Sequence, residues 1–282
     1  MSLAVEEVLG RIKSLEPLPQ VCVRVMDLAA EPDASPNDLI GVIHTDPGIT
    51  AKVLKLCNSA YYGFARRIDS LAEAGVLLGV NTLVNLVITA CAGRYFRDFG
   101  NVSSQTSKRL WQHTVTNALA ASMIARVHGR CDANRAYTVG LLQDMGAMVF
   151  ERFFPVERTE IRRALAADPT LDPQETERAL LGLDHAELGA LLAEQWRFPD
   201  VLVDSIRCHH APERATIDPT MASIAHLAHA VAEAHEAGEG LDHVAYALGP
   251  GALGLAGLDA SRLQALEELI EVELDRAREF LA

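Results

Sequence analysis

The chain has 282 residues, and its 38 acidic and 25 basic side chains give a formal net charge of −13. So few Lys and Arg residues exclude a surface that coats nucleic acid, because phosphate binding depends on clustered basic side chains. A hydrophobic fraction of 49% with 22% charged residues is typical of a globular protein with a sizeable core. Aromatic residues make up 5%, which favours packing by aliphatic helices, and the length allows one large domain or two small ones.

The cysteines and the N-terminus predict a cytoplasmic protein. The segment 1–7 has neither the basic flank nor the apolar stretch of a signal peptide. The uncharged segment 74–93 contains Asn81 and Asn85, so we interpret it as a buried helix, capped by Asn81, and not as a membrane span. The five cysteines have no CxxC spacing and are expected to be reduced thiols: Cys22, Cys57, Cys91, Cys131 and Cys208.

Helical periodicity runs along most of the chain. An apolar 3–4 spacing at 39–43 stops at Asp46-Pro47, and it resumes at 49–56, with Pro47 suited to a first helical turn. Similar spacing recurs at 118–127, 188–192 and 263–280. No alternation of apolar and polar residues is long enough to require a strand. The sequence therefore predicts an all-α fold.

Polar and glycine-rich breaks divide this helical pattern. The polar segment 100–108 separates two halves, the loop 168–173 interrupts the second half, and 249–257 precedes the last helix. We predict an N-terminal helical subdomain at 1–99, a second one at 100–235 and a C-terminal helical extension at 236–282. The first two are expected to share an interface.

Two groups of motifs resemble those of the HDOD family of bacterial signalling proteins. The first group is DPGITAKVLKLCNSAYYG at 46–63, followed by Ile68-Asp69-Ser70-Leu71 and Leu77-Leu78-Gly79. The second comprises Trp111-Gln112-His113, GLLQDMG at 140–146, DHAELG at 184–189 and His209-His210. The resemblance covers about residues 15–235. It implies a helical bundle of two packed subdomains whose C-terminal half is similar to HD-domain phosphohydrolases.

The residues at 58–63 also have a local interpretation. Asn58 and Ser59 close an apolar helix, and Gly63 is suited to a positive φ, which together indicate a helix terminus with side-chain capping. We favour a structural turn over a ligand site, since Asn and Ser commonly stabilise turns.

The resemblance implies a metal site in a degraded form. The HD pattern of two imidazoles and two carboxylates corresponds here to His113, Gln143, Asp144 and His229. Gln143 replaces an imidazole with a weaker neutral oxygen donor, and His229 replaces a carboxylate. Ala147 stands where hydrolytic relatives usually have a lysine. These departures predict a protein without hydrolytic activity.

Metal binding without turnover stays open. In two-metal relatives the positions that match His113, Asp144, His185, His209 and His210 are ligands, so Fe, Mn, Zn or Mg could bind here. The alternative is that each histidine is a hydrogen-bonded core residue and that no cofactor binds. The candidate pocket therefore consists of His113, Gln143, Asp144, His185, His209, His210 and His229.

Three functions remain compatible with the sequence. The resemblance implies a non-catalytic signalling module that binds protein partners or a small anionic ligand, such as a cyclic dinucleotide. Arg66, Arg67, Arg94 and Arg97 are candidates to face such a ligand, and the favoured alternative is that they are solvated charges at a helix end. The second is a metal-dependent phosphohydrolase acting on nucleotides or cyclic dinucleotides. The third is a scaffold in which the helix at 263–281 forms a homodimer or docks another protein. Neither nucleic acid nor a membrane is an expected partner.

Overall fold

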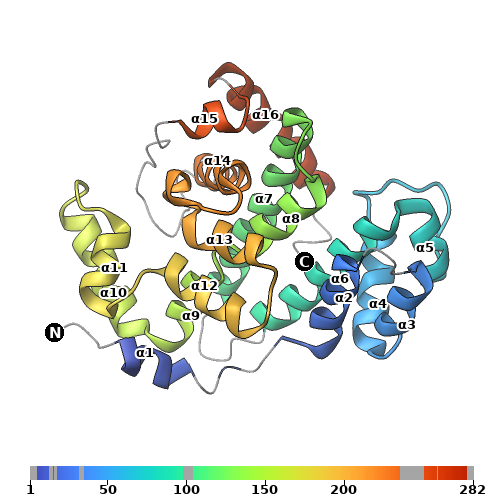
Figure 1. Cartoon of the computed structure of the whole chain (residues 1–282), viewed down its shortest axis with the longest axis horizontal. Helices are drawn as coiled ribbons and strands as arrows, with labels where there is room; N and C mark the ends of the chain where they lie inside the picture. Colours follow the sequence, from blue (N-terminus) through green and yellow to red (C-terminus); the bar gives the residue numbers. More distant parts are fainter. Residues whose placement is uncertain are drawn as a thin grey trace.

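The described part of the chain is helical, as predicted. The computed structural model describes residues 5–12, 15, 18–31, 35–97, 104–235, 251–258 and 260–277, and no strand occurs among them. The described helices form one bundle with a continuous hydrophobic core, so the predicted all-α helical bundle is confirmed (Figure 1). The predicted subdomain boundaries fall beside or within segments 98–103 and 236–250, which lie outside the described residues.

The first six helices carry the N-terminal motif group. Their bounds are α1 (Val5–Arg11), α2 (Gln20–Ala30), α3 (Pro36–Ile43), α4 (Pro47–Cys57), α5 (Leu71–Leu78) and α6 (Val80–Arg97).

The remaining helices carry the second motif group. They are α7 (Ser104–His128), α8 (Ala133–Leu142), α9 (Met145–Phe153), α10 (Pro155–Ala167), α11 (Pro173–Leu181), α12 (His185–Gln195), α13 (Asp200–Cys208), the short 3₁₀ helix η2 (Pro212–Arg214), α14 (Pro219–His235), α15 (Ala252–Leu255) and α16 (Ala260–Arg276). The predicted loop 100–108 is therefore shorter than expected, because α7 begins at Ser104.

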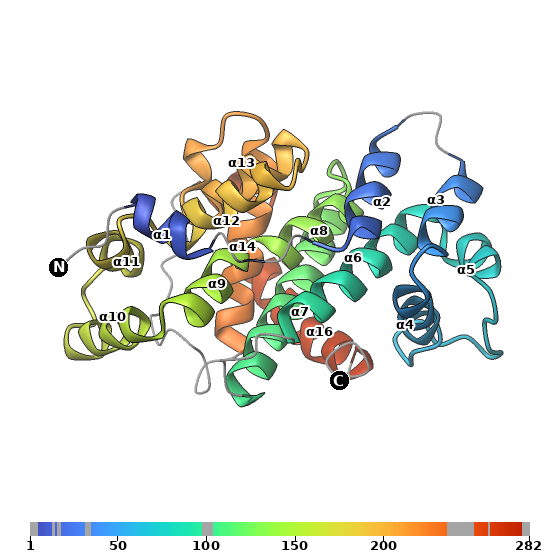
Figure 2. The ribbon, with the colours of Figure 1, turned by 90° about the horizontal axis from the view of Figure 1, so that it is seen from below.

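The long helices α6 and α7 join the two ends of the molecule. Helices α2 to α5 lie at one end beside α6, and the α10–α11 hairpin lies at the opposite end, next to α1 (Figures 1 and 2). Between them, α7 packs extensively against α8, and α14 and α16 also pack against α7. Helix α12 packs against both α9 and α13. The second half is thus built around α7.

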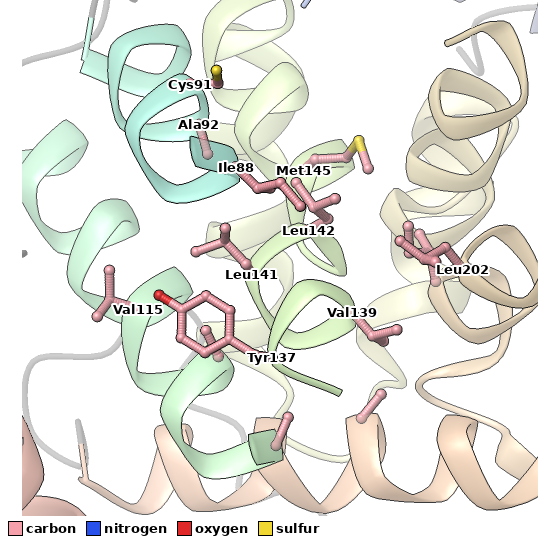
Figure 3. Close-up of a cluster of buried hydrophobic side chains, with 14 of the residues drawn as sticks. Ile88, Cys91, Ala92, Val115, Tyr137, Val139, Leu141, Leu142, Met145 and Leu202 are labelled. Atoms are coloured by element: carbon pink, nitrogen blue, oxygen red, sulfur yellow. The ribbon is translucent and has the colours of Figure 1, made fainter. Parts of the chain in front are cut away.

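Aliphatic side chains fill the junction between α6 and the second half. Figure 3 draws Ile88 of α6 beside Leu142, with Leu141 next to them and Val115 of α7 farther out in the same cluster. All four side chains are buried. Because this cluster contains residues from both halves, the halves share one apolar core.

Polar side chains also connect α6 to α8. Asn85 donates through Nδ2 to Asn134 Oδ1 at 3.1 Å and accepts from the Thr138 hydroxyl at 3.2 Å. The hydroxyls of Thr89 and Tyr137 lie 2.9 Å apart. These hydrogen bonds fix the register of the two helices, because buried polar groups need specific partners.

The N-terminal motif forms a helix closed at both ends. Asp46 caps α4 by accepting from the backbone N–H groups of Gly48 and Ile49, and Pro47 occupies the first turn as predicted. At the other end Asn58 donates to the carbonyls of Leu54 and Ile68, each at 2.8 Å. Asn58 also accepts from the Ile68 N–H at 2.7 Å.

Glycines shape the turns that follow. Gly63 has a φ of 60°, as predicted for this turn. Gly79, with a φ of 83°, ends α5 and lets the chain enter α6 directly, so α6 begins at Val80 and Asn81 lies within it. The prediction that Asn81 caps this helix is therefore wrong.

The described helices and cysteines agree with the sequence analysis in two further respects. None of the described helices combines the length and the apolar character that crossing a bilayer requires. The five cysteines are free thiols, and all but Cys131 are buried.

We expect Asn58→Ala to lower the free energy of unfolding by about 2 to 3 kcal/mol, because it removes three hydrogen bonds and leaves the Ile68 backbone groups without their partner. The matched control is Ser59→Ala, since the buried Ser59 hydroxyl has no hydrogen-bond partner among the described residues. Urea unfolding should place Ser59→Ala within about 0.5 kcal/mol of the wild type. Equal losses in both variants would contradict this role of Asn58.

Candidate functional site

The structure brings six of the seven predicted pocket residues together from five places in the second half, whereas Gln143 directly precedes Asp144 and no hydrogen bond joins its side chain to the others among the described residues. His113 comes from α7, and Gln143 and Asp144 come from the junction of α8 and α9. The other members are His185 at the start of α12, the pair His209-His210 after α13, and His229 of α14. Figure 1 shows α7, α12, α13 and α14 meeting in the middle of this half. All of these side chains are buried or nearly buried.

The carboxylate of Asp144 lies between two groups of histidines. Its Oδ2 atom is 3.4 Å from His113 Nε2 and 3.4 Å from His229 Nδ1. Its Oδ1 atom is 3.6 Å from His209 Nε2 and 3.9 Å from His185 Nε2. Each carboxylate oxygen therefore faces a different pair of imidazoles.

These contacts define two clusters of metal-ligand type. We call His113, Asp144 and His229 the first triad, and His185, His209 and His210 the second triad. Within each triad the potential ligand atoms all lie within 4.8 Å of one another. Asp144 belongs to the first triad, and its Oδ1 atom faces the second.

Hydrogen bonds on the far side of three imidazoles set their orientation. His209 donates from Nδ1 to the Ile206 carbonyl at 2.7 Å, so Nε2 is the atom turned toward Asp144. His185 places Nδ1 2.7 Å from Glu177 Oε2, and His229 places Nε2 3.3 Å from Glu233 Oε1. Because an imidazole that donates from one nitrogen can present a lone pair on the other, all three rings can offer a ligand atom to the pocket.

The charges of the pocket are strongly coupled. Burial disfavours the charged form of Asp144, but the charge of His229 and hydrogen bonds from His113 and His209 hold the pKa of Asp144 well below its usual range. Burial likewise works against charge on His185 and His229, yet Glu177 raises the pKa of His185 to about 9. Asp144 raises the pKa of His229 to about 9. Without a metal ion, the pocket therefore holds its carboxylate through protonated imidazoles.

The second triad contains a short contact between two rings. His185 Nε2 and His210 Nε2 are 2.6 Å apart. Burial, with His209 next to it, holds the pKa of His210 well below its usual range, whereas Glu177 raises the pKa of His185, so these shifts favour a hydrogen bond from His185 to a neutral His210. Burial also lowers the pKa of His209. The ring nitrogens of this triad thus converge on one small volume.

Glycines allow the helices to approach closely enough to form the pocket. A Cβ atom at Gly146 would lie 2.0 Å from the His185 carbonyl oxygen, and one at Gly140 would lie 2.5 Å from the Asn117 carbonyl oxygen. Neither position has room for a larger residue, because the nearby atoms belong to the backbone of a packed helix. Gly146 thereby brings Asp144 next to the first turn of α12.

Sequence reasoning missed three polar residues of the pocket. Asn117 donates through Nδ2 to Asp144 Oδ2 at 2.6 Å, and Glu177 and Glu233 contact His185 and His229. Asn117 follows His113 by four residues and Glu233 follows His229 by four, a spacing that places both members of a pair on one helix face. Glu177 is on a different helix from His185, and no local spacing indicates it.

Gln143 differs from its neighbours. Its side chain is completely buried, and its amide has no hydrogen-bond partner among the residues that the structure describes. Buried amides without partners are rare, so this position is poorly adapted to a purely structural role.

The donor set fits two divalent cations. Imidazole nitrogens and a carboxylate are ligands of Zn, Fe and Mn, and a carboxylate with one oxygen toward each triad has the form of a bridging ligand. The fit rests on the five imidazole rings of the two triads, three of them held by acceptors on their far side. Two ions bridged in this way are characteristic of hydrolytic sites that act on phosphate esters.

The described helices and this pocket define an all-α protein of HD-like architecture. The HDOD domain family matches residues 15–212, which is most of the chain. The chain therefore belongs to the HDOD family, and the resemblance inferred from the sequence is confirmed.

Solved structures share this fold over nearly the whole chain. A candidate phosphohydrolase from Shewanella amazonensis SB2B is 26% identical, with a TM-score of 0.75 over 97% of this chain and 96% of its own. An HDOD domain protein of unknown function from Geobacter sulfurreducens is 23% identical, with a TM-score of 0.72 over 98% and 94%.

One curated relative is longer than this chain. An uncharacterized protein of Treponema pallidum (strain Nichols) is 29% identical over 211 residues, which are 72% of this chain and 40% of the relative. The chain thus spans well under two thirds of the curated relative that it matches.

We expect Gly146→Ala to lower the free energy of unfolding by about 3 kcal/mol or more, since the added methyl group would collide with the His185 carbonyl oxygen at 2.0 Å. The control is Gly41→Ala in α3, where no atom lies within 4 Å of the added Cβ. Because Ala favours a helix interior over Gly, urea unfolding should show Gly41→Ala to be neutral or up to about 1 kcal/mol more stable. A tolerated Gly146→Ala would contradict the close packing of α9 against α12.

Proposed function

We propose that this chain is a regulatory HDOD module whose histidine pocket binds divalent metal ions and that acts by binding a ligand or protein partner, without turnover. The observation that carries the proposal is the buried Asp144 carboxylate, which lies 3.4–3.9 Å from the nitrogens of four imidazoles. Bound ions would supply positive charge for an anionic ligand and would lower the pKa of a bound water.

Two features of the chain favour binding over hydrolysis. Gln143 offers an amide where the HD pattern has an imidazole, and Ala147 stands in place of the lysine that is usual in hydrolytic relatives. The amide is a weaker donor than imidazole, so it supports an ion less well. The residues present can hold and orient an anionic ligand, and none among those described around Asp144 is a lysine or arginine that would stabilise a leaving phosphate.

The second candidate function is metal-dependent phosphohydrolysis of nucleotides or cyclic dinucleotides. The specific observation in its favour is the Asp144 carboxylate between two triads, together with the similarity to the Shewanella candidate phosphohydrolase. Under either function we propose that the protein acts in the bacterial cytoplasm and has signalling proteins as partners. We also propose that α16 mediates self-association, which sedimentation tests by measuring the mass of the protein in solution.

We expect the wild-type protein to bind two Mn²⁺ ions per chain and Asp144→Asn to weaken both, because Asp144 faces both triads. Equilibrium dialysis with elemental analysis gives the number of ions. The matched control is His44→Ala, which removes an exposed histidine far from the pocket motifs and should leave binding unchanged. A wild type that binds no Mn²⁺, Zn²⁺ or Fe²⁺ would contradict the metal proposal.

The same samples decide between binding and hydrolysis. With Mn²⁺ bound, we expect no release of nitrophenol from bis(p-nitrophenyl) phosphate above the rate in buffer. Hydrolysis that is present in the wild type and His44→Ala but lost in Asp144→Asn would replace the regulatory proposal by the phosphohydrolase.

We expect Gln143→His to strengthen the binding of Mn²⁺ or Zn²⁺ by about tenfold or more, because an imidazole replaces a buried amide that has no described partner. Isothermal titration calorimetry measures the change. Gln143→Leu is the control, since it keeps the volume but adds no donor, and it should not strengthen binding. Equal affinities for Gln143→His and the wild type would show that this position does not face an ion.

A further inference from the structure

We propose that Glu177 and Glu233 are positioning residues, each supporting one triad, so that the loss of either carboxylate weakens chiefly the binding of the ion at its own triad. This inference rests on the proposed metal binding. It assigns functions to two carboxylates that the HD pattern does not contain, and Glu233 lies beyond the residues matched by the HDOD family.

Glu177 holds His185 by two contacts. Its Oε2 atom is 2.7 Å from His185 Nδ1 and also accepts from the backbone N–H of His185 at 2.9 Å. The side chain is 3% exposed, so no solvent competes for these contacts. With Nδ1 occupied, Nε2 is the ring nitrogen that faces His210 and Asp144. Glu177 therefore selects the nitrogen of His185 that can bind an ion.

Glu177 is itself fixed from behind. Its Oε1 atom accepts from Arg158 Nη1 at 2.7 Å, and Arg158 donates through Nε to Glu151 at 2.9 Å. Arg158 is 2% exposed and bridges α9, α10 and α11 through these two carboxylates. A buried carboxylate needs such a partner, because an unpaired buried charge is strongly destabilising. The α10–α11 hairpin thus orients His185 through a rigid chain of ion pairs.

Glu233 supports the other triad in a simpler way. It lies one helical turn after His229 on α14, with Oε1 3.3 Å from His229 Nε2, and this contact turns Nδ1 toward Asp144. Its second oxygen is buried and has no hydrogen-bond partner among the described residues. Glu233 is therefore less firmly held than Glu177, and the two carboxylates contact histidines of different triads.

A double-mutant cycle on Mn²⁺ binding tests this division. His113→Ala disables the first triad and His185→Ala the second, so each variant retains one site. Loss of an orienting carboxylate typically weakens metal binding by about 10- to 100-fold. In the His113→Ala background, Glu177→Gln should therefore lower the affinity of the second triad for Mn²⁺ by about 10- to 100-fold. Glu233→Gln should change this affinity by less than about threefold. In the His185→Ala background, which retains the first triad, Glu233→Gln should give the large loss of affinity and Glu177→Gln the small one.

Electron paramagnetic resonance provides a second readout. Two Mn²⁺ ions bridged by a carboxylate are magnetically coupled, so the wild type should show the spectrum of a pair. At an ion concentration that just fills the wild-type sites, Glu177→Gln and Glu233→Gln should each show an isolated Mn²⁺ ion. A role limited to folding would lower the melting temperature without this selective loss.

Matched controls separate positioning from general damage. Glu175→Gln makes the same substitution two residues away on α11, where Glu175 contacts only Arg178 among the described ion pairs, and it should leave both ions bound. If Glu177→Gln does not fold, Glu177→Asp keeps the charge for Arg158 but withdraws the oxygen from His185, and it should give the same selective loss.

Three results would overturn the inference. If the wild type binds two ions and both glutamate variants match it, the positioning roles fall while the metal proposal stands. If each variant lowers the affinity for both ions equally, the carboxylates support the fold as a whole and not one triad. If the wild type binds no ion, the metal proposal and the positioning roles fall together.

Discussion

The structure of the second half depends on burying one carboxylate. Asp144 is removed from water, and a buried charge is stable only when other charges or hydrogen bonds surround it. Here these partners come from three separate helices and the end of a fourth: His113 and Asn117 of α7, His185 of α12, His229 of α14 and His209 after α13. Asp144 therefore ties together helices that are far apart in sequence, and the packing of each one affects the pocket.

Close packing of backbones makes this convergence geometrically feasible. Gly140 lets α8 approach α7 at Asn117, and Gly146 lets α9 approach the start of α12 at His185. Both glycines flank Asp144 in the sequence, so the short segment 140–146 sets the position of the carboxylate relative to its partners. A capping box of Asp184 and Glu187 then fixes the first turn of α12, where His185 lies. The local capping of α12 and the close approach of α9 at Gly146 thus both fix the position of His185.

Motifs with local spacing were predictable from the sequence, whereas contacts between helices were not. The start of α4 at Asp46-Pro47 and the positive φ of Gly63 follow from residue type alone. The pocket histidines followed from the family resemblance, because no periodicity relates His113 to His209. Glu177 was missed because its partner is on another helix, and the cap at Asn81 was wrong because Gly79 turns the chain directly from α5 into α6. Residue spacing predicts which side chains share a face of one helix, but it does not predict which side chains of different helices come into contact.

Helix α8 connects the histidine pocket to the N-terminal helices. Its first turn holds Asn134, which is hydrogen-bonded to Asn85 of α6, and its last residue is followed by Gln143 and Asp144. Helix α6 in turn packs against α2 and against α4 and α5, which carry motifs of the first group. A change in the position of Asp144 would have to move α8, strain its polar contacts with α6 or be absorbed at the α8–α9 junction. Because α8 is buried from Ala136 to Leu142 and packs tightly against α7 at Gly140, the first two responses are coupled, and the N-terminal helices are connected to the pocket through α6 and α8.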